Sequence, residues 1–222
     1  MRMVKLKGIE GAKQASGLVI IVDILRAATV EACAFYKGAR YIIPVATKEE
    51  AFSIKEKSPE FLLIGEEGGY KIKGFDYGNS PSEILNANIK DRILIHRSSS
   101  GTRGLNNAFD AEELIFGSFV IASSLVKYIQ QKSPEVVSIV AMDAEDNIFS
   151  DYLEKAIKGE IIDKEQVRKD LYNHPASAWF IDPSKSDFPN DDINIVLDFD
   201  KFNFICLVNK TASGLKTIKH QI

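Results

Sequence analysis

The sequence predicts an α/β protein, built as three layers with a mostly parallel or mixed sheet and an antiparallel pair of strands near the C-terminus. Short apolar runs alternate with helical segments over two thirds of the chain, which is typical of a sheet covered on both faces. The last third differs, because two stretches of alternating polarity flank Ser213-Gly214. The 222 residues suit one such domain. A C-terminal subdomain beginning at about residue 160 is the alternative.

The first part of the chain alternates strand and helix. Leu18–Ile24 is rich in Ile and Val and is predicted as a buried strand. Ala27–Lys37 has helical spacing and ends at Gly38, a common helix terminator. The elements that follow are the strand Arg40–Val45, the helix Thr47–Lys57 with a capping box of Thr47 and Glu50, the strand Phe61–Ile64, the Gly-rich stretch Gly65–Gly78, and a helix through Leu85 that Asn79-Ser80-Pro81 begins.

The alternation continues to about residue 157 and then changes. Its elements are the strand Arg92–His96, the polar loop Arg97–Thr102, the helix Gly104–Phe109, the strand Glu113–Phe116, the helix Ser118–Gln131, the strand Val136–Ala141 and the helix Ser150–Ile157. Beyond them Glu165–Asn173 is predicted as a helix, and the Pro- and Asp-containing segment Trp179–Asp192 as a loop or short turns. Phe202–Val208 and Leu215–His220 are predicted as an antiparallel pair at the sheet edge or in a small subdomain.

Composition and charge exclude several classes of protein. Lys plus Arg is 28 and Asp plus Glu is 31, so the net charge is −3 and no long basic run favours nucleic acid or an anionic membrane. The apolar stretch Leu18–Val22 is too short for a signal segment or a membrane span. Cys33 and Cys206 form no spaced motif, which suits a reducing compartment. We therefore expect a cytoplasmic protein that binds neither nucleic acid nor a membrane.

Polar residues that follow the predicted strands are the candidates for a site, because ligands of open α/β sheets bind beyond the carboxyl ends of strands. Carboxylates beside hydroxyl groups and helix starts favour a divalent cation with a bound anion. The candidates are Asp23, Arg26, Glu66, Glu67, Asp76, Asn79, Ser80, the segment Arg97–Thr102, and the residues Asp143, Glu145, Asp146, Ser150 and Asp151.

Simpler structural roles compete with these assignments. Asp23 equally suits a helix cap. Ser98–Thr102 is either a polar loop or a nest that binds an anion, although no Walker-type Gly-Lys-Ser/Thr is present. We interpret the acidic residues between Asp143 and Asp146 as a solvated turn, and Trp179 as a core residue.

Ordered segments of the chain resemble the 2-phosphosulfolactate phosphatases. The most specific is Phe75-Asp76-Tyr77-Gly78-Asn79-Ser80-Pro81, which follows a Gly-Glu pair. The others are Val19–Thr29, Gly65–Gly69, Ser98–Gly104, Ser150-Asp151, and Asp191-Asp192 with Asp198–Phe202, so the resemblance runs from about residue 18 to about residue 205. Two positions depart from it: Glu67 stands where the family often has Arg, and Ser100 where Asn is common.

The resemblance implies a Mg²⁺-dependent phosphatase that converts 2-phosphosulfolactate to 3-sulfolactate and phosphate in coenzyme M biosynthesis. It makes Asp23 and Glu66 the expected metal ligands. Asp23, Arg26 and Asp151 are the expected catalytic residues, with Asp151 as a further ligand or as the base that orients water. The residues expected to bind the small anionic phosphorylated substrate are Asn79, Ser80, Ser99, Ser100, Gly101 and Thr102.

Several alternatives stay open from the sequence. The substrate is either phosphosulfolactate or another phosphorylated carboxylic acid, which Glu67 favours, and a non-catalytic module that binds a small anion is the third hypothesis. Either Glu66 or Glu67 faces the metal. The phosphoryl group passes either directly to water or first to Asp23, in a covalent intermediate. A homodimer is plausible through Phe202–Val208, if that strand lies at an edge of the sheet.

Overall fold

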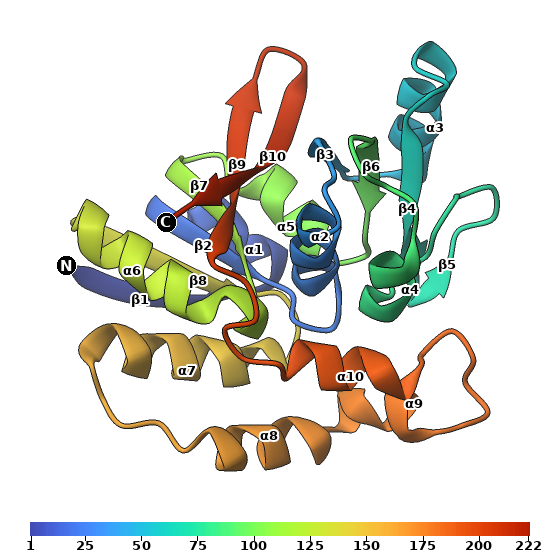
Figure 1. The fold of residues 1–222 in the computed structure, drawn as a ribbon. Coiled ribbons are helices and arrows are strands. Elements are labelled where there is room, and N and C mark those ends of the chain that lie inside the picture. Colours follow the sequence, from blue (N-terminus) through green and yellow to red (C-terminus); the bar gives the residue numbers. More distant parts are fainter.

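The computed structural model describes all 222 residues and contains a ten-stranded mixed sheet with helices packed against it (Figure 1). This arrangement confirms the predicted α/β class and the antiparallel C-terminal strands. The strands are β1 (Arg2–Lys7), β2 (Gly17–Val22), β3 (Tyr41–Val45), β4 (Leu62–Glu67), β5 (Tyr70–Lys71), β6 (Ile93–Arg97), β7 (Ala111–Gly117), β8 (Val136–Ala141), β9 (Phe204–Thr211) and β10 (Gly214–Gln221).

The helices fill the connections between these strands. They are α1 (Gly8–Gln14), α2 (Ala27–Tyr36), α3 (Lys48–Lys57), α4 (Pro81–Asn86), α5 (Gly101–Asn107), α6 (Ala122–Lys132), α7 (Asp146–Lys158), α8 (Lys164–Tyr172), α9 (Ala178–Ile181) and α10 (Asn190–Val196). The predicted cap of α3 forms as expected, since the Thr47 hydroxyl accepts the backbone N–H of Glu50 at 3.2 Å. None of the helices is both long and apolar enough to cross a membrane.

The sheet consists of two parallel halves, with the order β1-β8-β2-β7-β9-β10-β3-β6-β4-β5. Strands β1, β8, β2 and β7 run parallel to one another, and so do β3, β6 and β4. All six residues of β2 are buried, so both of its faces are covered. One cluster of 53 buried hydrophobic residues includes side chains from both halves, which therefore share a core.

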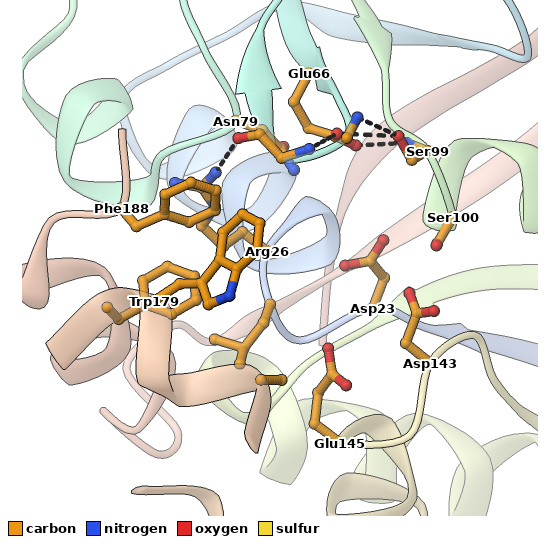
Figure 2. Close-up of a pocket in the computed structure, with 15 residues that line it drawn as sticks. Asp23, Arg26, Glu66, Asn79, Ser99, Ser100, Asp143, Glu145, Trp179 and Phe188 are labelled. Atoms are coloured by element: carbon orange, nitrogen blue, oxygen red, sulfur yellow. Dashed lines mark hydrogen bonds between the residues drawn. The ribbon is translucent and has the colours of Figure 1, made fainter. Parts of the chain in front are cut away.

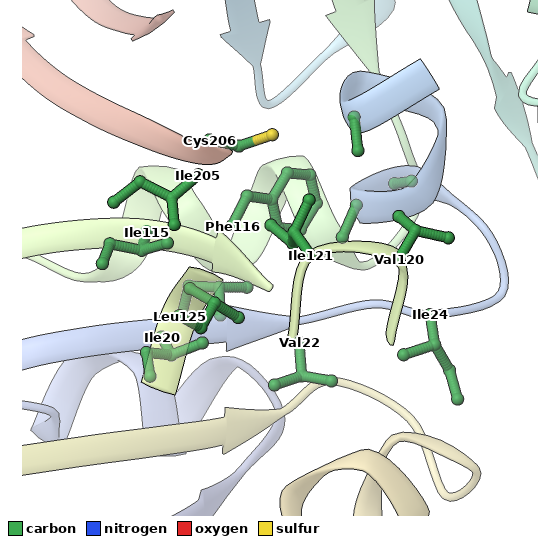
Figure 3. Packing of buried hydrophobic residues seen from close by; sticks show 14 of the residues in the cluster. Ile20, Val22, Ile24, Ile115, Phe116, Val120, Ile121, Leu125, Ile205 and Cys206 are labelled. Carbon is green, nitrogen blue, oxygen red and sulfur yellow. The ribbon is translucent and has the colours of Figure 1, made fainter. Parts of the chain in front are cut away.

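The hairpin of β9 and β10 joins the two halves at the centre of the sheet. The prediction that this pair lies at an edge or in a small subdomain is therefore wrong. β9 pairs with β7 through Phe116 and Cys206, and β10 pairs with β3 through Thr217 and Ile42. Figure 3 shows Ile205 beside Ile115, from the neighbouring strand β7, in the core. Because Phe202–Val208 offers no free edge, the reason for expecting a homodimer through it disappears.

Several other elements differ from the prediction. The N-terminal β1 and α1 had no predicted counterpart, and β1 takes an outer position beside β8. Helices α5 and α7 begin earlier than predicted, so Gly101 and Thr102 lie in the first turn of α5 and Asp146 lies in that of α7. The segment predicted as a loop contains α9 and begins α10, whose first turn carries Asp191 and Asp192 near the positive end of the helix dipole.

Gly65 allows β4 to approach β6 closely beside the residues that follow these strands. Its φ is +136°, and a Cβ atom there would overlap the carbonyl oxygen of Arg97. We expect Gly65→Ala to lower the free energy of unfolding by about 2–3 kcal/mol, because backbone must move to admit the methyl group. Urea denaturation measures this loss.

Gly68→Ala is the matched control for this prediction. Gly68 also has a positive φ of +62°, but a Cβ atom there meets nothing within 4 Å. Its replacement should cost only about 1 kcal/mol, from the strain of the left-handed backbone. Equal losses in the two variants would contradict the assignment of a close strand contact at Gly65.

Candidate active site

A cavity of about 240 Å³ lies where β2, β4 and β8 end, beside the loop that follows β6 (Figure 2). The two halves of the sheet contribute to it together. Its wall combines charged and hydroxyl groups with aromatic side chains. The lining residues are Asp23, Leu25, Arg26, Glu66, Gly68, Gly69, Asn79, Ser99, Ser100, Asp143, Glu145, Ala176, Trp179, Phe180 and Phe188.

Asp23 follows β2 and combines the two roles that its sequence position suggested. One carboxylate oxygen accepts the backbone N–H of Ala27 in the first turn of α2 at 3.0 Å. The other accepts the N–H of Gly101 at 2.8 Å and so joins the start of α5 to the end of β2. Burial, followed by the negative charges of Asp143, Glu66 and Glu145, raises the pKa of Asp23 to about 7.

The acidic turn after β8 also belongs to the site. Its interpretation as a solvated turn is wrong for Glu145 and Asp146, which are buried, and holds for Asp143, which is exposed. Asp143 and Glu145 line the cavity, and Figure 2 places their carboxylates beside Asp23. Asp146 is buried and accepts the N–H groups of Ile24 and Asp143 at 2.8 and 2.9 Å. It thereby connects the two turns that carry the acidic groups. Its own pKa is well above the ordinary value, because of burial and then the charges of Asp23 and Glu145.

Arg26 is the basic group in the wall of the cavity, and it is almost completely buried. Its Nη1 donates to the carboxylate of Asp192 and the carbonyl of Asp187, both at 2.9 Å, and its Nη2 donates to the carbonyl of Gly69 at 2.9 Å. The guanidinium also lies over the ring of Phe188, 4.8 Å from its centroid. These bonds use three of the five N–H donors of the guanidinium and leave two for an anion.

Glu66, and not Glu67, faces the cavity. The carboxylate of Glu66 accepts the backbone N–H of Ser99, the Ser99 hydroxyl at 3.0 Å and the N–H of Gly69 at 2.6 Å. It is therefore largely engaged in holding the loop after β6. Glu67 is half-exposed and pairs with Lys48 at 2.7 Å and with Arg97 at 3.5 Å. Its charge is thus compensated outside the cavity.

The predicted anion-binding loop divides into two groups of residues. Ser99 and Ser100 line the cavity. Thr102 is buried and exchanges hydrogen bonds with Ser98, since each accepts the backbone N–H of the other at 2.8–2.9 Å. Gly101 uses its N–H on Asp23. The structure therefore brings Ser99 and Ser100 to the site, while Thr102 stabilises the start of α5.

Of the neighbouring residues Asn79 and Ser80, only Asn79 lines this cavity. Asn79 lines the cavity and its amide oxygen lies 3.1 Å from Nε2 of His96. Ser80 points instead to Asp192, whose carboxylate accepts its hydroxyl at 2.8 Å. The same carboxylate accepts the N–H and the hydroxyl of Ser82 at 2.9 and 2.7 Å. Asp192 thus connects α10, α4 and Arg26.

Asp151 lies away from these residues. It is an exposed side chain of α7 that forms an ion pair with Lys5 of β1 at 2.8 Å. The preceding residue Ser150 is buried and donates to the backbone carbonyl of Asp146. Because α7 begins at Asp146, its first residue occupies the position nearest the end of β8, and Asp151 is carried more than one turn further along.

Aromatic residues from the C-terminal third close one side of the cavity. Trp179 is 43% exposed and lines it, so the interpretation of Trp179 as a core residue is wrong. Phe188 contacts Trp179 edge to face, with the ring centroids 4.8 Å apart, and also lies against Tyr70. The sequence carried little signal for this wall, because the rings come from short helices and turns without clear periodicity.

The arrangement separates negative from positive groups across one small cavity. No basic side chain forms an ion pair with Asp23, Asp143 or Glu145, while Arg26 keeps N–H donors that no protein group uses. A cation bound at the carboxylates would leave the guanidinium and hydroxyl side to receive an anion. This is the pattern expected for binding and polarising a phosphate ester.

Comparison with known proteins gives consistent results. A family model described as 2-phosphosulpholactate phosphatase matches residues 4–210. The probable 2-phosphosulfolactate phosphatase of Thermoplasma volcanium is 34% identical over 154 residues, which are 68% of this chain and 72% of that protein. The protein of the same name from Bacillus subtilis is 29% identical over 180 residues, or 78% and 79% of the two chains.

A third relative matches over a shorter region. The probable 2-phosphosulfolactate phosphatase of Caldanaerobacter subterraneus is 36% identical over 125 residues. These are 55% of this chain and 52% of that protein, so the chain matches about half the length of that relative.

Proposed function

Because the chain belongs to the 2-phosphosulfolactate phosphatase family, we propose that it hydrolyses a small, highly anionic phosphomonoester of the 2-phosphosulfolactate type with the help of Mg²⁺. The observation that carries the proposal is the placement of Asp23 and Arg26 in one cavity, where Arg26 has unused N–H donors and Asp23 has no basic side chain paired with it. The volume of about 240 Å³ lies below the roughly 300–1,000 Å³ of sites for larger ligands. It favours a compact substrate.

The donor groups of the cavity fit a hydrated magnesium ion. No three carboxylate, His or Cys side chains converge closely enough to enclose an ion directly. Mg²⁺ in proteins commonly takes one or two carboxylates and keeps several waters. The pKa of Asp23 is raised first by burial and then by repulsion from neighbouring carboxylates. A bound cation would relieve that repulsion. Asp23 and Asp143 would hold the ion, with Glu66 behind them.

The side chains then have distinct tasks in the hydrolysis. Arg26, with two free N–H donors, would bind phosphoryl oxygens and stabilise the charge that grows on them. Ser99, Ser100 and Asn79 would hydrogen-bond the remaining anionic oxygens. A bound Mg²⁺ would neutralise phosphate charge and promote deprotonation of a water. Direct attack of a water on phosphorus, which breaks the ester P–O bond while the water's proton passes to the departing alkoxide, is the simpler route; Asp23 as nucleophile is the alternative.

The position of Glu67 bears on the choice of substrate. In the sequence, a glutamate in place of the family's arginine argued for a different phosphorylated acid. Its carboxylate is bound by Lys48 and Arg97 and does not line the cavity. The substitution therefore places no additional uncompensated negative charge beside the substrate. This supports phosphosulfolactate as the first substrate to test, ahead of other phosphorylated carboxylic acids or a non-catalytic anion-binding role.

Phosphate release tests the proposal directly. We expect the purified protein to release phosphate from racemic 2-phosphosulfolactate with Mg²⁺ and to stop when EDTA is added. A panel of phosphorylated carboxylic acids, assayed in parallel, distinguishes the substrates. Release from another acid alone would retain the phosphatase assignment and change the substrate. Binding of phosphate without release from any ester would contradict the catalytic proposal.

The pKa of Asp23 predicts how magnesium affects stability at different pH. Since the pKa rises from 3.8 to about 7 on folding, the folded protein holds this proton more tightly than the unfolded chain. Its contribution to stability therefore declines as pH rises through this range. Mg²⁺ competes with the proton, so it should raise the melting temperature more at about pH 9 than at about pH 5.

Thermal melting with MgCl₂, and with KCl at equal ionic strength, measures this effect. Asp23→Asn should reduce the pH dependence of the magnesium effect, because the side chain no longer ionises. The same variant should lose phosphate release. If Mg²⁺ raised the melting temperature equally at the two pH values, or if Asp23→Asn kept full activity, Asp23 would not be a ligand of the metal.

A further inference from the structure

A buried chain of three polar side chains reaches the cavity from the core. Glu31 on α2 lies 2.9 Å from Nδ1 of His96 on β6, and Nε2 of His96 lies 3.1 Å from the amide oxygen of Asn79. Glu31 and His96 are completely buried, while Asn79 lines the cavity (Figure 2). The chain therefore connects a charged group inside the protein to the wall that faces the substrate.

The hydrogen-bond partners of His96 determine its charge. With Glu31 ionised and the amide oxygen of Asn79 turned toward Nε2, as the structure has it, both ring nitrogens of His96 donate, because these oxygens can only accept hydrogen bonds. An imidazole that donates from both nitrogens is an imidazolium cation. Its charge compensates Glu31, whose other carboxylate oxygen has no hydrogen-bond partner and which forms its ion pair with His96.

The surroundings of Glu31 offer no other cation in contact with it. Cys206 on β9 lies nearby, and burial followed by the negative charge of Glu31 raises the pKa of its thiol well above the ordinary value. The thiol is therefore neutral. A buried glutamate charge with no cation would be costly, which favours the protonated form of His96.

The charge on His96 and the orientation of the Asn79 amide depend on each other, because Nε2 either donates to the amide oxygen or accepts from the NH₂ group. The oxygen and the NH₂ group of an asparagine have nearly the same shape, so their positions are set by hydrogen-bond partners. A donating Nε2 holds the amide oxygen inward, and the NH₂ group is then available to the cavity. A neutral ring accepting at Nε2 would turn the amide and present an oxygen to an anionic substrate.

We propose that Glu31 and His96 are positioning residues, which form a buried ion pair and hold Asn79 so that its amide NH₂ donates to an anionic oxygen of the substrate. The inference rests on the proposed function for the identity of the ligand. It adds that the selectivity of this wall for an anion depends on two residues that do not touch the substrate.

A double-mutant cycle on the affinity for inorganic phosphate tests the coupling. The first change replaces the ion pair by apolar residues of similar size, Glu31→Met with His96→Leu, since such replacements of buried pairs are often tolerated. The second is Asn79→Ala. We expect the apolar pair to weaken phosphate binding roughly ten-fold when Asn79 is present, which is the value of one charge-assisted hydrogen bond. In the Asn79→Ala background it should have no further effect.

The outcomes separate positioning from general support of the fold. Equal weakening in both backgrounds, or no weakening in either, would overturn the proposal. Circular dichroism and thermal melting verify that each variant is folded. Glu113→Gln is the matched control, because Glu113 is a partly buried carboxylate that binds Tyr128 and Lys132 away from the cavity. It should leave phosphate affinity unchanged.

Imidazole NMR gives a second test that needs no substrate or activity. In the ¹⁵N spectrum of the 222-residue protein, both nitrogens of His96 should carry protons at neutral pH. A single protonated nitrogen would contradict the ion pair. If the wild-type protein neither bound phosphate nor hydrolysed phosphate esters, the proposed function would fail, and the NMR spectrum would still decide the state of His96.

Discussion

Replacing Asp192 with alanine is expected to lower the free energy of unfolding by about 3–5 kcal/mol, because it leaves a buried guanidinium without its counter-ion. The side chains of Asp192 and Arg26 are 0% and 3% exposed, and their atoms lie 2.9 Å apart. The same carboxylate accepts hydrogen bonds from Ser80 and Ser82. The variant should also lose phosphate release, since Arg26 loses the group that orients it. Urea denaturation and the release assay measure the two effects.

The neighbouring residue offers a matched control. Asp191 lies in the same first turn of α10 but is exposed. Asp191→Ala should change stability by no more than about 0.5 kcal/mol, as is usual for surface substitutions. Asp192→Asn should fall between the two, because it keeps an acceptor for the serines and loses the charge. If Asp191→Ala and Asp192→Ala proved equally stable, Asp192 would not anchor Arg26.

Replacing Arg26 with lysine is expected to lower the rate of phosphate release by about 10²–10³, the usual effect of removing one group that stabilises developing charge. Arginine has five donors, and three of them bind Asp192, Asp187 and Gly69. A lysine ammonium has three donors, and these anchors would take all of them. The positive charge would remain, but no directed donor would be left for the phosphoryl oxygens. Steady-state kinetics with the phosphate ester that the release assay identifies measure this loss.

A control variant and a stability measurement distinguish a loss of phosphate binding at Arg26 from other causes of a lower rate. Arg40→Lys changes an exposed arginine outside the cavity and should leave the rate unchanged. A melting temperature close to that of the wild type would show that Arg26→Lys still folds with Asp192 compensated. Retention of the full rate in Arg26→Lys would mean that charge alone, and not the paired donors, acts on the phosphate.

Many of the polar residues that line the cavity could be predicted from the sequence, because they follow local patterns. A strand rich in Ile and Val must be buried, and the polar residues directly after it must lie at its carboxyl end. This reasoning identified Asp23 and Arg26 after β2 and Glu66 at the end of β4, and the structure brings them into one cavity. Ser99 and Ser100 were identified in the same way, and Asn79 through the motif that follows the Gly-rich stretch.

The contacts that hold these residues in place could not be predicted from local sequence patterns. Arg26 and Asp192 are separated by 166 positions, and no local spacing relates them. Asp143 and Glu145 looked like any solvated acidic turn until β8 was placed beside β2. Conversely, Asp151 seemed suitable by its place near a strand end, but the earlier start of α7 moves it to an exposed position paired with Lys5.

By itself, the sequence determined the α/β class, the polar ends of its strands and the family to which the chain belongs, because periodicity and short motifs are local properties. Only the tertiary structure decided that the hairpin of β9 and β10 lies at the centre of the sheet, and that Asp192 anchors Arg26. Alternating polarity identifies a strand but not its neighbours, and the burial of an ion pair depends on packing between distant segments. Those are properties of the assembled core, where many separate segments must fill one space together.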